Sequence, residues 1–123
     1  GTADKIAEEA IKKLCEIGAK KENIYVAIGP CIDECCYEVG NDFAEQIKTK
    51  LGQNYKNRFI IFKEDDKLFA NLKGMNVELL TSCGVPESNI DVAPYCTCCN
   101  PELFYSHRRQ KGIRGSHLSI IVK

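Results

Sequence analysis

Eight cysteines in a chain of 123 residues pose the first question about its fold, because so many thiols can replace or supplement a hydrophobic core. They occupy positions 15, 31, 35, 36, 83, 96, 98 and 99. An even number suits disulfides in a secreted protein. However, adjacent cysteines such as Cys35 and Cys36 do not easily bridge each other, and the first residues lack the pattern of an export signal. We therefore expect mainly free thiols.

Zinc ligation is the alternative use of these thiols. Cys96 and Cys99 have C-x-x-C spacing, and Cys31 with Cys35 or Cys36 would complete four ligands. The earlier pair would be spaced C-x3-C or C-x4-C and lies about 60 residues away, whereas zinc domains usually carry two C-x-x-C or C-x-x-H pairs. We expect no metal on this chain alone, and a small zinc-binding domain rests on the cysteines only.

Hydrophobic periodicity indicates that the rest of the chain forms helices and strands. Apolar residues three and four apart predict helices over residues 2–17, 42–51 and 68–80, ending at Gly18, Gly52 and Gly84. Short apolar runs predict strands at residues 23–28, 58–63, 89–93 and 118–122, with a turn at 64–66. Two aperiodic loops remain, residues 29–36 and 94–115, and long loops of this kind are usually functional or mobile.

The order of these elements predicts one α+β domain over residues 1–123, with a mixed β-sheet flanked by helices. Seventeen basic residues balance seventeen acidic ones, so no net field favours nucleic acid or anionic lipid as a partner. The longest apolar runs are far shorter than the roughly 20 residues needed to cross a bilayer. We therefore expect a soluble, cytoplasmic protein with no nucleic-acid or membrane partner.

His107, Arg108 and Arg109 form the densest group of candidate binding residues. An imidazole beside two guanidiniums suits phosphate or carboxylate, although such a run is also typical of a solvated basic turn. A nucleophilic pair of Cys96 and His107 lacks an evident third residue to orient it. His117 lies at the start of the last predicted strand and is expected to be an ordinary surface or packing histidine.

Several short motifs, in matching order and spacing, resemble the YfiH-type family, first called multicopper polyphenol oxidoreductases. The matching segments are Ile28-Gly29-Pro30, Tyr37-Glu38-Val39-Gly40, Asn71-Leu72, Val77-Glu78-Leu79-Leu80, Gly84-Val85, Cys96-Thr97 and Phe104-Tyr105-Ser106-His107-Arg108-Arg109. Two positions depart from the family pattern: Asn71 replaces an aspartate, and Ser116 replaces the arginine of a closing G-R-M-A motif. The match covers essentially the whole chain.

The resemblance implies the carboxyl-terminal half of a larger α/β/β/α fold. Members of the family are described as zinc-dependent enzymes that cleave purine nucleosides by phosphorolysis or deaminate adenosine; older descriptions assign copper-dependent phenol oxidation. Their metal and catalytic residues are a histidine in Q-x-H-G, a cysteine in A-D-C and a histidine in H-A-G-W-R-G. None of these motifs occurs here, so the resemblance implies a triad upstream of Gly1 and a chain that is inactive alone.

Substrate contacts are expected at Tyr37, Cys96, His107, Arg108 and Arg109, and we hypothesise that the two arginines help to form a phosphate site. Purine nucleoside and phosphate are the ligands that the resemblance implies for the intact enzyme, with zinc as its cofactor. A catalytically inactive, shortened relative that acts as a binding module is the alternative, which the changed closing motif favours. An apolar surface left uncovered would favour pairing with the missing half or with a second copy.

Overall fold

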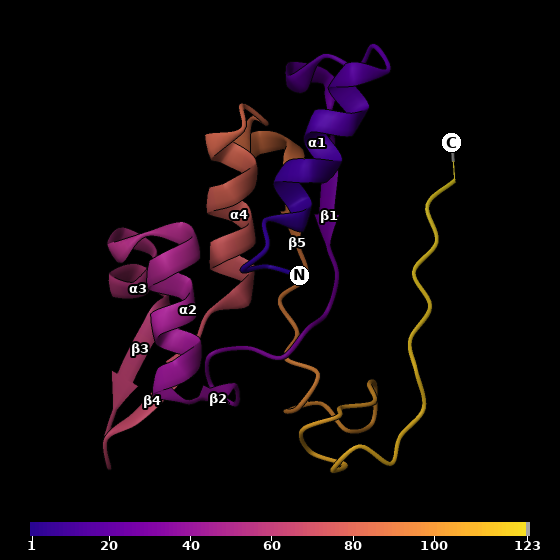
Figure 1. The fold of residues 1–123 in the computed structure, drawn as a ribbon. Helices are drawn as coiled ribbons and strands as arrows, with labels where there is room; N and C mark the ends of the chain where they lie inside the picture. The colour runs from indigo at the N-terminus through magenta and orange to yellow at the C-terminus, as the bar shows by residue number, and fades with distance from the viewer. Residues whose placement is uncertain (123) are drawn as a thin grey trace.

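Two small β-sheets, rather than one, organise the chain (Figure 1). This computed structural model describes residues 1–122. Strand β1 (Val26–Ile28) pairs in parallel with β5 (Ile90–Val92), and an antiparallel sheet contains β2 (Glu38–Val39), β4 (Lys67–Ala70) and β3 (Ile60–Lys63) in that order. The predicted α+β class is confirmed, but the predicted mixed sheet is divided into a parallel and an antiparallel part.

Helix α4 (Leu72–Ser82) stands between the two sheets (Figure 1). It contacts α1 on the side of β1 and β5, and α3 on the side of the antiparallel sheet. The other helices are α1 (Ile6–Glu16), α2 (Asn41–Leu51), α3 (Gln53–Phe59) and the short 3-10 helices η1 (Lys21–Asn23) and η2 (Glu87–Asn89). Among the described residues, every helix is too short or too polar to cross a bilayer.

Each side of α4 has a hydrophobic core of its own. One core consists of the buried residues Ile11, Ile24, Leu80 and Val85. The other consists of Ile47, Phe59, Ala70 and Met75. Because α4 supplies Leu80 to the first core and Met75 to the second, it holds together two halves that share no sheet. Apolar burial of this kind is the main source of folding free energy.

Tertiary pairing moves two of the predicted helix and strand boundaries. Residues 68–70 belong to β4 and not to a helix, because this strand hydrogen-bonds to both β2 and β3. The helix begins only after Asn71, whose side-chain oxygen caps it by accepting a 2.7 Å hydrogen bond from the Gly74 N–H. Residues 53–59 form α3, where the sequence predicted the start of a strand at residue 58, so β3 begins two residues later than expected.

Positive backbone φ angles mark the predicted chain reversals. Gly52 (φ 111°) and Gly84 (φ 101°) follow α2 and α4, which confirms their role as helix stops. Asp65 and Asp66, with φ of 60° and 55°, form the turn between β3 and β4. Lys5 (φ 56°) was not foreseen: its left-handed conformation delays the start of α1, which was predicted to begin near residue 2.

The predicted strand at residues 118–122 is wrong. This segment runs as an extended chain beside the body of the protein and takes no part in either sheet (Figure 1, yellow). The exposed fraction of its apolar side chains ranges from 76% for Ile120 to 94% for Ile121. An apolar run becomes a strand only when its backbone N–H and C=O groups pair with a neighbour, and the described strands do not pair with it.

Candidate functional site

The two aperiodic loops meet in the structure because the strands before them are parallel neighbours. β1 and β5 run side by side, so the chain leaves both strands at the same end of the sheet. Cys31 and Cys96 then form an isolated parallel bridge, and the Thr97 N–H donates a 3.1 Å hydrogen bond to the Cys31 carbonyl. We call these segments the first loop (residues 29–37) and the second loop (residues 94–117). The ends of adjacent parallel strands are a common place for ligand sites.

A cluster of four thiols, here called the cysteine cluster, joins the two loops. It comprises Cys35 and Cys36 of the first loop and Cys96 and Cys99 of the second, and their four sulfurs all lie within 4.8 Å of one another. Cys99 Sγ is 3.5 Å from Cys35 Sγ and 3.3 Å from Cys36 Sγ. Among the described residues it is the only cluster of three or more side chains suited to hold a metal ion.

The ligand set that the sequence suggested is therefore partly wrong. Cys31 was a member of the alternative zinc set considered from the sequence, but its thiol lies outside the cluster and donates to the Ile32 carbonyl at 3.4 Å. A tight turn explains why both Cys35 and Cys36 belong instead. The N–H groups of Cys36 and Tyr37 both donate to the Asp33 carbonyl, at 2.9 and 2.8 Å, and this turns consecutive side chains towards the second loop.

The thiols of the cluster differ in acidity. Burial acts to raise the pKa of Cys96, but hydrogen bonds from the backbone N–H groups of Asp33, Cys99 and Cys98 outweigh it and lower the pKa to about 7. Burial, reinforced by the Cys99 and Cys96 thiols, raises the pKa of Cys35 to about 11. The pKa of Cys36 is raised further, again by burial first and by Cys99 second. Cys96 is thus the most acidic thiol of the cluster, and soft sulfur ligands of this kind suit zinc or copper(I).

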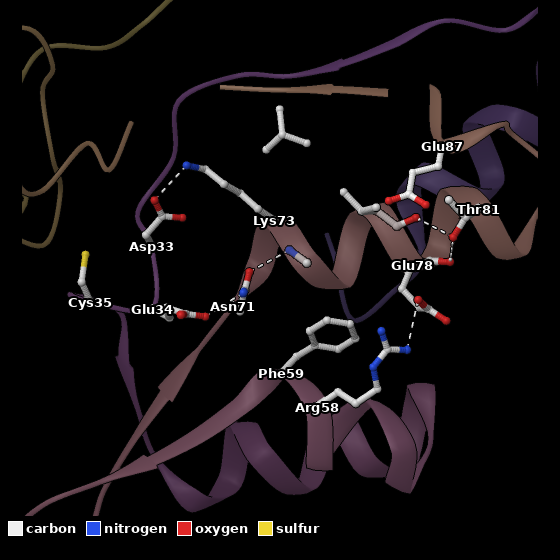
Figure 2. A pocket seen from close by; sticks show the side chains of 13 residues that line it. Asp33, Glu34, Cys35, Arg58, Phe59, Asn71, Lys73, Glu78, Thr81 and Glu87 are labelled. Atoms are coloured by element: carbon white, nitrogen blue, oxygen red, sulfur yellow. Dashed lines mark hydrogen bonds and ion pairs between the residues drawn. The ribbon is translucent and has the colours of Figure 1, made fainter. Parts of the chain in front are cut away.

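A buried lysine fixes both loops to α4. Lys73 is 8% exposed, and its Nζ lies 2.9 Å from Asp33 Oδ2 in the first loop and 2.9 Å from the Tyr95 carbonyl in the second. Figure 2 shows its side chain reaching from the helix to Asp33. Asn71 at the start of α4 adds a 2.6 Å hydrogen bond to the Glu34 carboxylate. The cysteine cluster therefore rests on a helix that is part of both cores.

A polar cleft of about 450 Å³ lies on the other side of the second loop, against residues 30–32. Its histidine and arginine lining residues are His107, Arg108, Arg114 and His117, and no carboxylate from residues 1–122 lines it. Tyr105 supplies an aromatic wall and is 50% exposed. A concave surface with two guanidiniums and no acidic side chain suits an anion.

The five residues proposed from the sequence for substrate contact do not all lie at the same site. His107 and Arg108 line the cleft. The Arg108 guanidinium lies 5.4 Å from the centre of the Tyr37 ring, a cation–π contact, and donates to the Glu38 carbonyl at 3.0 Å. Tyr37 therefore helps to position Arg108. Cys96 belongs to the cysteine cluster instead.

Arg109 has a different position from its neighbour. Its guanidinium donates hydrogen bonds to three backbone carbonyls of the second loop: Thr97 at 2.7 Å, Cys98 at 2.9 Å and Phe104 at 2.6 Å. These contacts use most of its donors and tie the beginning of the loop to its middle. Arg109 therefore shapes the loop and does not line the cleft.

Sequence reasoning missed Arg114 and His117 as members of the cleft. His117 was expected to be an ordinary surface or packing histidine, but its Nε2 accepts a 2.9 Å hydrogen bond from the Tyr105 N–H, and its ring lies 5.7 Å from the ring centres of Phe104 and Tyr105. Because these residues lie in an aperiodic segment, periodicity gave no sign of their convergence. The density of basic and aromatic residues between positions 104 and 117 was the only available signal.

A larger cavity of about 720 Å³ lies between the first loop, α3 and α4 (Figure 2). Its cations are already paired: Lys73 with Asp33, and Arg58 with Glu78 at 3.1 Å. Two further carboxylates, Glu34 and Glu87, also line it. Four acids against two paired cations make this cavity unsuitable for an anionic ligand, in spite of its size.

The sequence and fold are similar to those of known proteins. Residues 1–123 match a family model described as multi-copper polyphenol oxidoreductase laccase. The purine nucleoside phosphorylase YlmD of Geobacillus stearothermophilus is 37% identical over 101 residues, which cover 80% of this chain and 36% of that protein. Adenosine deaminase RL5, from an unknown prokaryotic organism, is 32% identical over 109 residues, covering 89% and 41%.

Solved structures agree. The crystal structure of YlmD from Geobacillus stearothermophilus superposes with a TM-score of 0.83 at 33% identity, over 94% of this chain and 43% of that one. That of the Bacillus licheniformis hypothetical protein YfiH gives 0.81 at 30% identity, over 91% and 42%. The chain thus spans less than half the length of these relatives. Since the family model matches the chain from end to end, the chain belongs to the multi-copper polyphenol oxidoreductase laccase family, as its motifs predicted.

Proposed function

We propose that this chain forms one part of an enzyme that cleaves purine nucleosides by phosphorolysis, and that the polar cleft is its binding surface for phosphate and nucleoside. The names of its relatives, purine nucleoside phosphorylase and adenosine deaminase, support the substrate class. The observation that carries the proposal for this chain is the cleft lined by Arg108, Arg114, His107 and His117 with no carboxylate.

The chemistry of phosphorolysis explains why such a cleft is needed. Phosphate must be held next to the sugar while the bond to the base breaks, and guanidinium groups bind its oxygens through pairs of N–H donors. Arg108 spends one donor on the Glu38 carbonyl and is braced by Tyr37, so its remaining donors are oriented before the anion arrives. The exposed Tyr105 ring offers a flat apolar surface for a purine.

Zinc, or copper in older descriptions, would supply a Lewis acid or an activated water in the intact enzyme. The residues of this chain do not fit that catalytic centre. Its two histidines line the cleft and, among the described residues, belong to no group of cysteine, histidine or carboxylate side chains close enough to hold a metal ion. We therefore assign to this chain the binding of phosphate and nucleoside, and no step that uses the catalytic metal.

Phosphate binding by the full chain tests the assignment. We expect Arg114→Ala to weaken phosphate binding about 10-fold or more, because a hydrogen bond to a charged group contributes about 1.5–3 kcal/mol. Lys111→Ala is the matched control, since Lys111 belongs to the same basic loop but does not line the cleft. In a longer protein that contains this chain, Arg114→Ala should raise the KM for phosphate more than the KM for nucleoside. Equal phosphate affinity in the two variants would contradict the assignment.

A non-catalytic binding module is the second candidate function. Ser116 favours it, because this residue lines the cleft at the position where the family pattern has an arginine. The two functions differ in one measurement. The measurement is made on a longer protein that contains this chain. Binding of nucleoside and phosphate without release of free base would support the binding module, whereas phosphate-dependent release of free base would support the enzyme.

We also propose that the exposed apolar tail pairs with another part of the enzyme or with a second copy. Ile120, Ile121 and Val122 are consecutive and 76%, 94% and 84% exposed, and Leu118 nearby is 83% exposed, which is unusual for apolar residues on a free surface. Ile121 extends this surface into a shallow hollow beside β1 and β5. The unpaired thiols suit a reducing compartment, so we place the protein in the cytoplasm.

A further inference from the structure

We propose that Cys35, Cys36, Cys96 and Cys99 together bind one zinc ion in a structural, tetrahedral site. This site is separate from the polar cleft and from any catalytic metal of the enzyme. The inference rests on the arrangement of the cysteine cluster and holds whether or not purine nucleosides are the substrate.

The distances between the sulfurs fit a tetrahedral ion. Zinc binds thiolate sulfur at about 2.3 Å, which places the four sulfurs of a tetrahedron about 3.8 Å apart. In the cluster all four lie within 4.8 Å of one another, and Cys99 Sγ lies 3.5 and 3.3 Å from Cys35 Sγ and Cys36 Sγ. Side-chain movements of a fraction of an ångström to about 1 Å would complete the coordination, without a change in the backbone.

The backbone around the cluster is already arranged to receive thiolates. The Asp33 N–H donates to Cys96 Sγ at 3.4 Å, and the N–H groups of Cys98 and Cys99 also face this sulfur. Such donors stabilise negative charge on sulfur, and in the C-x-x-C segment they come from the turn that carries Cys99 itself. On the opposite side, the backbone that carries Cys35 and Cys36 is held in a turn by hydrogen bonds from the N–H groups of Cys36 and Tyr37 to the Asp33 carbonyl. Neither loop must refold for the ion to bind.

The donor set selects the metal and its role. Four sulfur ligands from the protein leave no open position for water or substrate, which is typical of structural zinc and not of catalytic zinc. On binding, each thiol that is still protonated loses its proton to solvent, and Zn²⁺ then carries four thiolates with a net charge of −2. Lys63, which donates to the Glu34 carbonyl at 2.9 Å, and Lys73, which pairs with Asp33, provide positive charge around the first loop.

The ion would also act on the polar cleft, although no zinc ligand lines that cleft. Arg109 donates to the carbonyls of Thr97 and Cys98, which are the two residues between Cys96 and Cys99. The same guanidinium donates to Phe104, close to the cleft residue Tyr105. Zinc bound at the cluster therefore fixes the backbone of Thr97 and Cys98. Arg109 links this backbone to Phe104, which precedes the cleft residue Tyr105.

Metal analysis of the full chain, purified under reducing conditions without added metal, tests the proposal. We expect about one zinc per wild-type chain and a loss of most of it in Cys99→Ser, since structural sites require all four ligands. Cys31→Ser and Cys83→Ser are matched controls that remove a thiol outside the cluster, and they should keep the zinc. Cys31→Ser is the sharper control, because Cys31 lies in the first loop and belongs to the four-cysteine set that was considered from the sequence.

Cobalt substitution gives a readout that needs no variant. Tetrahedral cobalt(II) with thiolate ligands produces sulfur-to-metal charge-transfer bands and strong visible bands, and added zinc should abolish them. Because Cys99 is exposed, its replacement by serine leaves the cores intact, which circular dichroism will verify. Wild-type protein that takes up no zinc or cobalt after full reduction would overturn the proposal. Equal loss of zinc from Cys31→Ser and Cys99→Ser would also overturn it, as would a Cys36–Cys99 disulfide whose reduction restores no metal binding.

Discussion

The ammonium group of Lys73 lies 2.9 Å from the carboxylate of Asp33, and Lys73 is the only charged side chain that is buried in the described part of the chain. The same ammonium group donates to the Tyr95 carbonyl. One side chain of α4 therefore positions the first loop, which carries two cysteines of the cluster, and the second loop, which carries the other two. The helix that joins the two cores is also the support of the candidate site.

Replacing Lys73 by methionine should lower the free energy of unfolding by about 2–3 kcal/mol, because the Tyr95 carbonyl and the Asp33 carboxylate lose a buried partner. Methionine retains the apolar stem of the side chain, so the loss reports the ammonium group and not a cavity. Lys13→Met is the control, since the Lys13–Glu16 pair is exposed and contributes little. Urea unfolding of both variants measures the difference, and equal midpoints would refute the role of Lys73.

Gly74→Ala should destabilise the protein although alanine favours helices. A Cβ at position 74 would lie 2.8 Å from the Phe59 ring, closer than side-chain atoms normally approach. Overpacking costs about 1–3 kcal/mol, which exceeds the gain of about 1 kcal/mol in helix propensity. Thermal unfolding should therefore show a lower Tm, and adding Phe59→Leu should recover part of it. An increase in Tm on Gly74→Ala alone would show that α3 and α4 are less tightly packed than described.

Arg109→Lys should loosen the second loop while it keeps the charge. A lysine cannot reach the carbonyls of Thr97, Cys98 and Phe104 at once, so we expect a loss of about 2 kcal/mol of stability. Arg114→Lys is the counterpart, because Arg114 is exposed and binds only its own neighbours Gly115 and Ser116. It should change phosphate affinity and leave the unfolding midpoint unchanged. If Arg109→Lys changed phosphate affinity and Arg114→Lys lowered the unfolding midpoint, Arg109 would be the anion ligand.

The Asp4 carboxylate should titrate below the ordinary pH range of an aspartate. A hydrogen bond and ion pair with Lys50, and secondarily the amino terminus, lower its pKa. A group whose folded pKa is lowered contributes stability above its unfolded pKa, and this contribution disappears as the pH falls below about 4 and through the folded value. NMR titration of Asp4 measures its pKa directly. In Lys50→Gln the pKa should move up towards the usual value, and an unchanged pKa would exclude Lys50 as the cause.

The sequence predicted those features that depend on neighbours along the chain. The apolar spacing in α4 and the glycines at 52 and 84 identify helices and their ends without any knowledge of the fold. Prediction from the sequence failed where pairing with a segment far away in the chain decides between helix and strand. Residues 68–70 carry apolar side chains at a spacing that also suits a helix, and only pairing with β2 and β3 makes them a strand.

The candidate site shows the same division. His107 and Arg108 were found from residue type alone. The exchange of Cys31 for a second cysteine in the cluster depends on the turn at Asp33, which spacing rules for zinc motifs do not describe. The distinct roles of Arg108 and Arg109 likewise depend on which guanidinium the carbonyls of the second loop engage.

Binding of phosphate and a purine nucleoside in the polar cleft can be tested by NMR on the ¹⁵N-labelled chain titrated first with phosphate and then with inosine. We expect saturable shifts in the backbone signals of His107, Arg108 and Gly115, with further shifts at Tyr105 when inosine is added. Shifts confined to the cavity between α3 and α4, at Thr81 and Glu87, or no shifts at all, would contradict it.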